Sequence, residues 1–173
     1  MYSYETDLEG IDYNKLKNFL EEKGIKYNKK ENKITIYSDD YYFLYKFDKF
    51  IKCLKVGFDI DLSKNILYSD WDLLEIDLKQ IFEKKINHVI RIKGRIIGEK
   101  GKALKELSDR TNSNIIIKDR YIYLLGDDIS IRAAYEGIRR LINGEKHEHV
   151  YEFLDRYKEN LKNKEKEINK YTK

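Results

Sequence analysis

Two glycines stand three positions apart in the stretch Ile96-Ile97-Gly98-Glu99-Lys100-Gly101. Glycine lets the backbone turn sharply and approach a ligand without obstruction by a Cβ atom. The following segment, 102–110, is predicted to be a helix, and the first N–H groups of a helix are unpaired and carry a partial positive charge. A phosphate group fits such a site. Glu99 is tolerated there only if its carboxylate points away from the phosphates.

Basic residues surround this glycine loop. Residues 84–120 hold 11 Lys or Arg and 4 Asp or Glu, which marks the segment as a candidate polyanion surface. If the helical spacing of the predicted helix 86–97 extends back to residue 84, the positions i, i+4, i+7 and i+11 share one face, occupied by Lys84, His88, Arg91 and Arg95. The opposite side carries Ile86, Val89, Ile90 and Ile97. A solvated polar face would explain the basic residues on their own, but beside the loop a contact with RNA is favoured.

The candidate RNA-binding residues are His88, Arg91, Lys93, Arg95, Ile97, Gly98, Glu99, Lys100, Gly101, Lys102 and Lys105. Lys100 and Lys102 are expected to contact phosphates.

The elements that position the loop follow from periodicity. Residues 71–78 have enough apolar content for a strand, and 86–97 read as a helix entering the loop. Segments 115–117 and 121–125 are β-branched and aromatic runs that indicate a hairpin. Asp127 or Asp128 then caps a helix that Gly144 ends. The order is strand, helix, glycine loop, helix, strand, strand, helix.

The two halves of the chain align at an offset of 88 residues without a gap. Apolar positions coincide, for example Leu16 with Leu104 and Ile34 with Ile122, and the pair Asp39-Asp40 falls on Asp127-Asp128. The secondary-structure pattern repeats as well, which indicates a duplication.

The first copy lacks a working loop. Gly10-Ile11-Asp12-Tyr13 falls on Gly98-Glu99-Lys100-Gly101, so an aspartate replaces the lysine and a tyrosine replaces the second glycine. These changes would repel phosphate. Only nine residues precede Gly10, too few for a strand and a helix, so we expect a truncated unit of helix, strand, strand and helix.

The order of elements around Gly98-Glu99-Lys100-Gly101 resembles the type I KH domain. More narrowly, residues 70–157, including the run Arg91 to Lys102 and the string His147-Glu148-His149-Val150-Tyr151-Glu152-Phe153-Leu154, resemble the archaeal members of the Dim-two family, also called partner of Nob one. The expected fold class is α+β, with tandem type I KH units. The expected domains are a degenerate KH-like module at 1–66, a complete KH domain at 70–145, and a C-terminal helix with a lysine-rich tail at 146–173.

This resemblance implies a role in small ribosomal subunit assembly and rRNA processing. It implies binding of single-stranded RNA near the 3′ end of 16S rRNA, with a Nob-type endonuclease and the alpha subunit of archaeal initiation factor two as partners. KH domains clamp about four backbone nucleotides while bases lie in an apolar groove. Ile97, Leu104 and one face of Ile115 to Ile117 would line or support that groove. A KH adaptor of the exosome or of mRNA, and a protein-interaction scaffold without RNA, are the alternatives.

Other chemistry has little support, and we predict neither an enzyme nor a cofactor. The carboxylates Asp70, Asp72, Glu75 and Asp77, with Asp59 and Asp61 nearby, are compatible with a metal-dependent nuclease, but a strand would point alternate members to opposite faces. His147 and His149 have no cysteine partner and fit a capping or surface role better than a metal site.

The remaining features concern the class of protein. The single cysteine, Cys53, excludes an internal disulfide and fits a buried structural thiol. No segment has the roughly 18 to 20 apolar residues of a membrane span, so we expect a soluble, cytoplasmic protein with no membrane contact. The apolar stripe from Val150 to Leu161 indicates a helix that either docks on its own domain or binds a partner.

Overall fold

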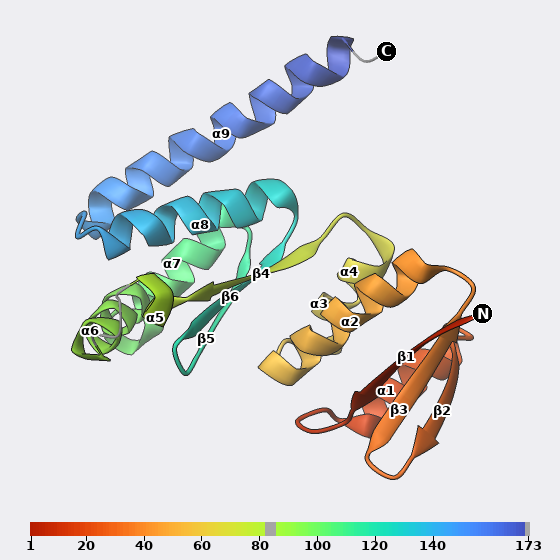
Figure 1. Ribbon diagram of the computed structural model, residues 1–173. Helices are drawn as coiled ribbons and strands as arrows, with labels where there is room; N and C mark the ends of the chain where they lie inside the picture. The colour runs from red at the N-terminus through yellow and green to blue at the C-terminus, as the bar shows by residue number, and fades with distance from the viewer. Residues whose placement is uncertain (82–85, 172–173) are drawn as a thin grey trace. The chain divides into compact units, whose positions relative to one another are not determined.

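A computed structural model describes residues 1–81 and 86–171, and the chain divides into two compact units, Met1–Leu73 and Leu74–Lys173. Each unit pairs a three-stranded sheet with helices, which confirms the α+β class (Figure 1).

The first unit begins with a strand. Its elements are β1 (Tyr2–Asp7), α1 (Tyr13–Glu22), β2 (Lys26–Lys30), β3 (Lys33–Ser38), α2 (Tyr41–Val56), α3 (Ile60–Ser63) and α4 (Asn65–Tyr68). Both β1 and β2 pair antiparallel with β3, so the strand order is β1-β3-β2. Ile34 and Ile36 alternate along β3 and are fully buried beneath Leu16 of α1 and Phe47 of α2.

The predicted truncation was therefore wrong in one respect, because the first strand is present. Six residues suffice for β1, and Leu8–Asp12 leads directly into α1 without an intervening helix. What this unit lacks is a helix between its first strand and α1. The short helices α3 and α4 were not predicted either.

Apart from the short helix α5, which was not predicted, the second unit has the predicted order of elements. These are β4 (Asp72–Asp77), α5 (Leu78–Ile81), α6 (Ile86–Ile97), the 3-10 turn η1 (Glu99–Gly101), α7 (Lys102–Thr111), β5 (Asn114–Lys118), β6 (Tyr121–Gly126), α8 (Asp128–Ile142) and α9 (His147–Tyr171). The strand order is β4-β6-β5, so β5 lies at an edge of the sheet. Leu107 of α7, Leu124 of β6 and Ile138 of α8 meet in one buried core.

The first half of α9 docks on its own unit. Val150 and Leu154 are fully buried, and a Cβ atom at Gly137 of α8 would lie 3.0 Å from Leu154 Cδ1. Arg110 of α7 donates to Asp155 at 2.6 Å, and its guanidinium lies 5.0 Å from the centre of the Tyr151 ring. The later turns of α9 extend past the other helices of the unit (Figure 1). The sequence left open whether this helix docks on its own domain or binds a partner. Docking accounts for the first turns of α9.

Cys53 is buried, as the sequence predicted. Burial raises the pKa of its thiol to about 12, so the reactive thiolate is scarce near neutral pH. No helix in the described part of the chain is long and apolar enough to cross a membrane.

The contact between α8 and α9 predicts that Gly137→Val destabilises the second unit by about 1–3 kcal/mol, because the added methyl groups would overlap Leu154 and Leu107. Chemical denaturation followed by circular dichroism measures the change. Gly94→Ala is the matched control: a Cβ atom at this helical glycine meets nothing within 4 Å, so alanine should stabilise α6 by up to about 1 kcal/mol. Equal stability of Gly137→Val and wild type would contradict this packing.

Candidate nucleic-acid interface

The glycine loop joins α6 to α7 through three residues with left-handed backbone angles. The φ angles are +72° at Gly98, +51° at Lys100 and +77° at Gly101. Gly98 N donates to the carbonyl of Gly94 at 2.9 Å, and Gly101 N donates to the carbonyl of Gly98 at 3.3 Å. The chain thus leaves α6, turns tightly within η1, and enters α7 at Lys102.

The two glycines serve different purposes. A Cβ atom on Gly98 would lie 2.6 Å from Ala103 Cβ and 2.9 Å from Ala103 N, so only glycine lets the end of α6 approach α7 this closely. A Cβ atom on Gly101 would meet nothing within 4 Å. Gly98 is therefore required by packing, whereas Gly101 leaves open space beside the backbone.

The start of α7 lacks a side-chain cap. Its N-cap residue is Gly101, and among the described residues no side chain accepts a hydrogen bond at this helix start. By contrast, α1, α2, α3 and α8 each begin with an aspartate whose carboxylate accepts from the first N–H groups: Asp12, Asp40, Asp59 and Asp127. Lys102 N already donates to the Glu99 carbonyl within η1, so any N–H groups of this first turn that an external anion could accept from are the ones that follow Lys102.

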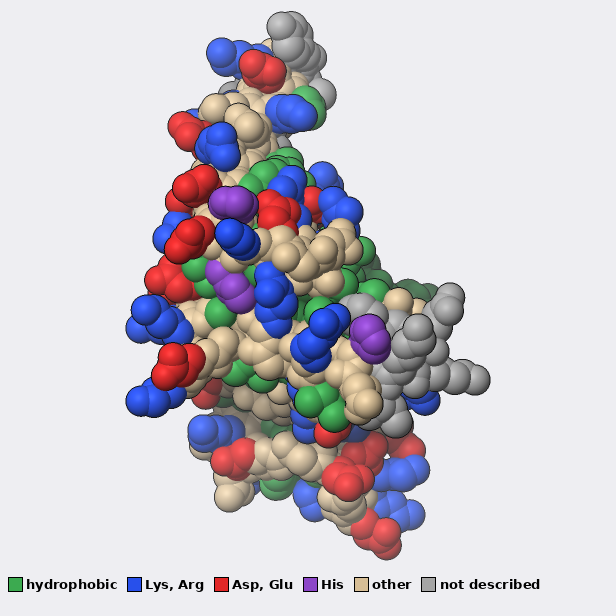
Figure 2. Space-filling view, turned by 90° about the vertical axis from the view of Figure 1, so that its left-hand side faces the viewer, with side chains coloured by type: hydrophobic (Ala, Val, Ile, Leu, Met, Phe, Trp, Pro, Cys, Tyr) green, Lys and Arg blue, Asp and Glu red, His purple; other side chains and the backbone are tan. Residues whose placement is uncertain are grey.

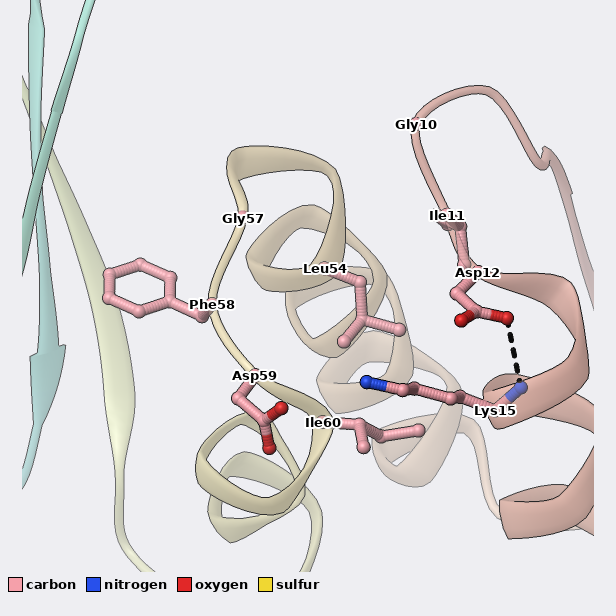
Figure 3. Close-up of a pocket in the computed structure, with 9 residues that line it drawn as sticks. All are labelled: Gly10, Ile11, Asp12, Lys15, Leu54, Gly57, Phe58, Asp59 and Ile60. Carbon is pink, nitrogen blue, oxygen red and sulfur yellow. Dashed lines mark hydrogen bonds between the residues drawn. The ribbon is translucent and has the colours of Figure 1, made fainter.

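At the helix start after Gly10 in the first unit, a carboxylate of the chain itself accepts from the first N–H groups. Asp12, which aligns with Lys100, accepts hydrogen bonds from Asn14 N at 3.1 Å and Lys15 N at 3.2 Å (Figure 3). Gly10, Asp12 and Lys15 line a pocket of about 260 Å³ together with Asp59. The carboxylates of Asp12 and Asp59 at this pocket disfavour a phosphate; Asp12 belongs to the sequence argument, whereas Asp59 was not part of it.

The buried face of α6 differs from the one predicted. Ile92 and Ile96 are 3% and 0% exposed and belong to the core, and Val89 packs against it. Ile90, predicted with Val89 on the apolar side, is 64% exposed. Ile97 is half-buried at the end of the helix. Lys84, predicted to share the basic face, lies outside the described residues.

Arg95 has a structural role that the prediction of RNA contact did not include. Its Nε donates to the carbonyl of Leu141 at 3.0 Å, and its Nη2 donates to the carbonyl of Glu145. His147 Nε2 in turn donates to the carbonyl of Arg95 at 2.9 Å. These bonds fasten the last turn of α6 to the end of α8 and the start of α9, and the guanidinium is directed into this junction.

Lys93 also has an internal partner. Its ammonium group donates to the carbonyl of Asp119, in the turn between β5 and β6. Leu104, Ile115 and Ile117 are partly buried against the core, so part of each side chain stays accessible. These residues and Ile97 are the ones that the KH resemblance assigned to the groove.

The other predicted residues lie at the surface. Exposed members of the set are His88, Arg91, Glu99, Lys100, Lys102 and Lys105. On the face shown in Figure 2, Lys and Arg side chains lie interspersed with Asp and Glu side chains. The sequence therefore located an exposed basic surface around the loop, but it assigned Arg95 to that surface although its guanidinium is bonded within the unit.

Three of the carboxylates considered as metal ligands pair with lysine or arginine. Lys49 donates to Asp72 at 2.6 Å, Arg120 lies 3.0 Å from Asp77, and Lys64 donates to Asp61 at 2.6 Å. Among the described residues, no three His, Cys, Asp or Glu side chains are grouped so that they could hold a metal ion.

The packing of the loop predicts unequal effects of alanine at its two glycines. Gly98→Ala should destabilise the second unit by several kcal/mol, because the methyl group would overlap Ala103 and the backbone has a conformation restricted to glycine. Gly101→Ala should cost only about 1 kcal/mol, from the left-handed angle alone. Thermal denaturation of both variants measures the difference, and equal losses would contradict the separate purposes of the two glycines.

Comparison with known proteins places this geometry in a family. The model of a eukaryotic type KH-domain (KH-domain type I), the second KH domain of PNO1, matches residues 73–159, which include the loop and the docked part of α9. A pre-rRNA-processing protein PNO1 of Debaryomyces hansenii is 31% identical over 142 residues, which cover 82% of this chain and 54% of that protein. A KH domain-containing protein of Methanocaldococcus jannaschii is 24% identical over 75% of this chain and 58% of its own length. The chain thus spans about half the length of these curated relatives.

Solved structures agree in fold. A protein of unknown function from Aeropyrum pernix matches with a TM-score of 0.80 at 24% identity, over 99% of this chain and 98% of that one. Dim2p from Pyrococcus horikoshii matches with a TM-score of 0.71 at 20% identity, over 90% of this chain and 99% of that one. With the family model matching half of its length, the chain belongs to the PNO1/Dim2 family of type I KH-domain proteins.

Proposed function

We propose that this chain binds single-stranded RNA by holding a phosphate at the start of α7. The observation that carries the proposal is the first turn of α7, which has no side-chain cap and adjoins the open space at Gly101. Lys100 and Lys102 are exposed on either side of that glycine and add positive charge. Glu99 is exposed as well, so its carboxylate is free to turn toward solvent.

The bases would lie along the apolar surface beside the loop. Ile97, Leu104 and the edge strand β5 provide that surface, and the bond from Lys93 to Asp119 links α6 to the far end of β5. KH domains hold about four nucleotides in this way. Of the predicted contacts, Arg95 is left out because its guanidinium serves the junction with α8.

The first unit would not bind RNA in this manner. Its strand order β1-β3-β2 corresponds to β4-β6-β5, which supports a degenerate KH copy. In that copy, the Asp12 carboxylate occupies the position that a phosphate takes at α7. Only the loop Gly98–Gly101 would therefore bind RNA among the two glycine loops, and the chain would hold one short stretch of RNA backbone there.

The relatives suggest which RNA and partners are involved. The curated PNO1 relatives are named for pre-rRNA processing, and a solved complex from Pyrococcus horikoshii contains Dim2p, rRNA and the alpha subunit of initiation factor two. That Dim2p matches this chain with a TM-score of 0.73 at 20% identity, over 92% of this chain and 95% of that one. We infer that this chain acts in the cytoplasm as a non-enzymatic assembly factor of the small ribosomal subunit, near the 3′ end of 16S rRNA. The same alpha subunit and a Nob-type endonuclease are its proposed partners.

The loop predicts that Gly101→Asp lowers the affinity for a single-stranded RNA with the 16S 3′-end sequence by at least about tenfold, because a carboxylate would stand where the phosphate binds. Fluorescence anisotropy measures the dissociation constant. Gly144→Asp is the matched control: Gly144 has a φ of +90° and equally open surroundings, so the same charge and a similar strain are added away from the loop. Its affinity should stay within about twofold of wild type.

A salt series of the same titration counts the phosphate contacts. The logarithm of the affinity should fall with the logarithm of salt concentration by about 0.7 per contact, so two to four contacts give a slope between about −1.4 and −2.8. Equal affinities of Gly101→Asp and wild type would exclude the loop as the RNA clamp. If wild type shows no measurable affinity for the RNA at any salt concentration, a protein-interaction scaffold is favoured instead.

A further inference from the structure

Four exposed tyrosines gather where β1 meets the start of α2 in the first unit. Tyr41, Tyr42 and Tyr45 of α2 are 68%, 62% and 52% exposed, and Tyr2 of β1 is 53% exposed. The rings of Tyr42 and Tyr45 stack with centroids 6.2 Å apart, and those of Tyr2 and Tyr41 meet edge to face at 5.7 Å. We call these four residues the tyrosine face. The glycine loop plays no part in it.

The tyrosine face is not needed for the core. The opposite side of α2 supplies Leu44, Phe47 and Phe50, which are at most 4% exposed and fill the interior with β3 and α1. Exposing four aromatic rings forgoes the favourable burial of a large apolar area. Such a group of exposed rings is characteristic of a binding surface.

Lysines are interleaved with the rings and held in place. Lys46 Nζ lies 5.4 Å from the centre of the Tyr42 ring and donates to the carbonyl of Ser69 at 2.7 Å. Lys49 Nζ lies 4.9 Å from the centre of the Tyr45 ring and is bonded to Asp72. The cation–π contacts and these anchors restrict both ammonium groups to the rim of the rings.

We propose that the tyrosine face binds single-stranded RNA through stacking of unpaired bases on Tyr42 and Tyr45. Every base has a π-face, and stacking on aromatic side chains beside cationic groups is how single strands are held without sequence readout. The centre of a protein–protein interface is depleted in lysine, whereas here each stacked ring has a lysine beside it, which favours RNA over a protein as the occupant.

The charges of this surface predict an unusual salt response. Nearby carboxylates offset the lysines: Asp40 caps α2, Asp48 accepts from the Tyr4 hydroxyl at 2.8 Å, and Asp72 pairs with Lys49. Phosphate attraction is therefore small, and stacking carries the affinity. Binding at the tyrosine face should depend weakly on salt, unlike binding at the glycine loop.

The test uses the full chain, an RNA of about 15 nucleotides that exceeds one KH site, and the double variant Tyr42→Ala/Tyr45→Ala. The double variant should bind this RNA about five- to tenfold more weakly for each ring removed. Tyr42→Phe/Tyr45→Phe keeps the rings and should retain wild-type affinity. Tyr135→Ala, which removes a 45% exposed tyrosine of α8, controls for the loss of any surface ring.

Two further arms separate this proposal from the glycine loop. The Gly101→Asp variant should retain weak RNA binding that does not depend on salt. Adding Tyr42→Ala/Tyr45→Ala to this variant should abolish the remaining binding, whereas adding Tyr42→Phe/Tyr45→Phe should not. Photo-crosslinking should attach RNA to the segment 41–46, and mass spectrometry of the digested protein should locate the adduct there. If Gly101→Asp binds as wild type while the alanine pair loses affinity, the loop fails as the clamp and the tyrosine face stands.

Unchanged affinity of the alanine pair, with crosslinks confined to residues after 74, would overturn the proposal. The same holds if the alanine pair leaves RNA binding intact but abolishes self-association in sedimentation, since the face would then bind a second copy of the chain.

Discussion

The close approach of Gly98 to Ala103 determines the geometry of the connection between α6 and α7. The candidate site depends on this connection. Because no side chain fits between them, the backbone turns within η1 and α7 begins directly at Lys102. This leaves its first N–H groups without a side-chain partner, beside the open surroundings of Gly101. Just before the loop, the bonds of Arg95 and His147 connect the last turn of α6 to the end of α8 and the start of α9. These contacts fix the position of the helix that enters the loop.

The helix starts that follow Gly10 and Gly98 differ in what stands at them. In both, a helix follows a glycine with a positive φ angle, at Gly10 and at Gly98. In the first unit, Asp12 neutralises the helix start with its own carboxylate, whereas Lys100 at the aligned position leaves that start open and adds a positive charge. The N-cap residue is therefore an aspartate with a bonded carboxylate at α1 and a glycine without a side chain at α7. The first unit instead presents aromatic rings on α2, which suit bases better than phosphates.

Local patterns in the sequence predicted most of the second unit. The strong period of α8 and the β-branched runs of β5 and β6 gave their positions to within one or two residues, and the glycine pair located the loop. The role of Arg95 could not be predicted, because its acceptors are backbone carbonyls 46 and 50 residues away. The strand β1 was missed because its alternation of tyrosines with Ser3 and Glu5 becomes meaningful only once it pairs with β3. The buried face of α6 was also misplaced, since isoleucines occur around most of that helix and periodicity does not choose among them.

The most direct measurement of the central claim is an amide proton–nitrogen NMR titration of the full chain with a short single-stranded RNA. The account predicts that the amides of Gly98–Ala103 shift most strongly, since they surround the phosphate, while those of Gly10–Lys15 stay in place because Asp12 already fills the corresponding position. Shifts of similar size at both helix starts, or none at Gly98–Ala103 under conditions where the RNA binds, would contradict it.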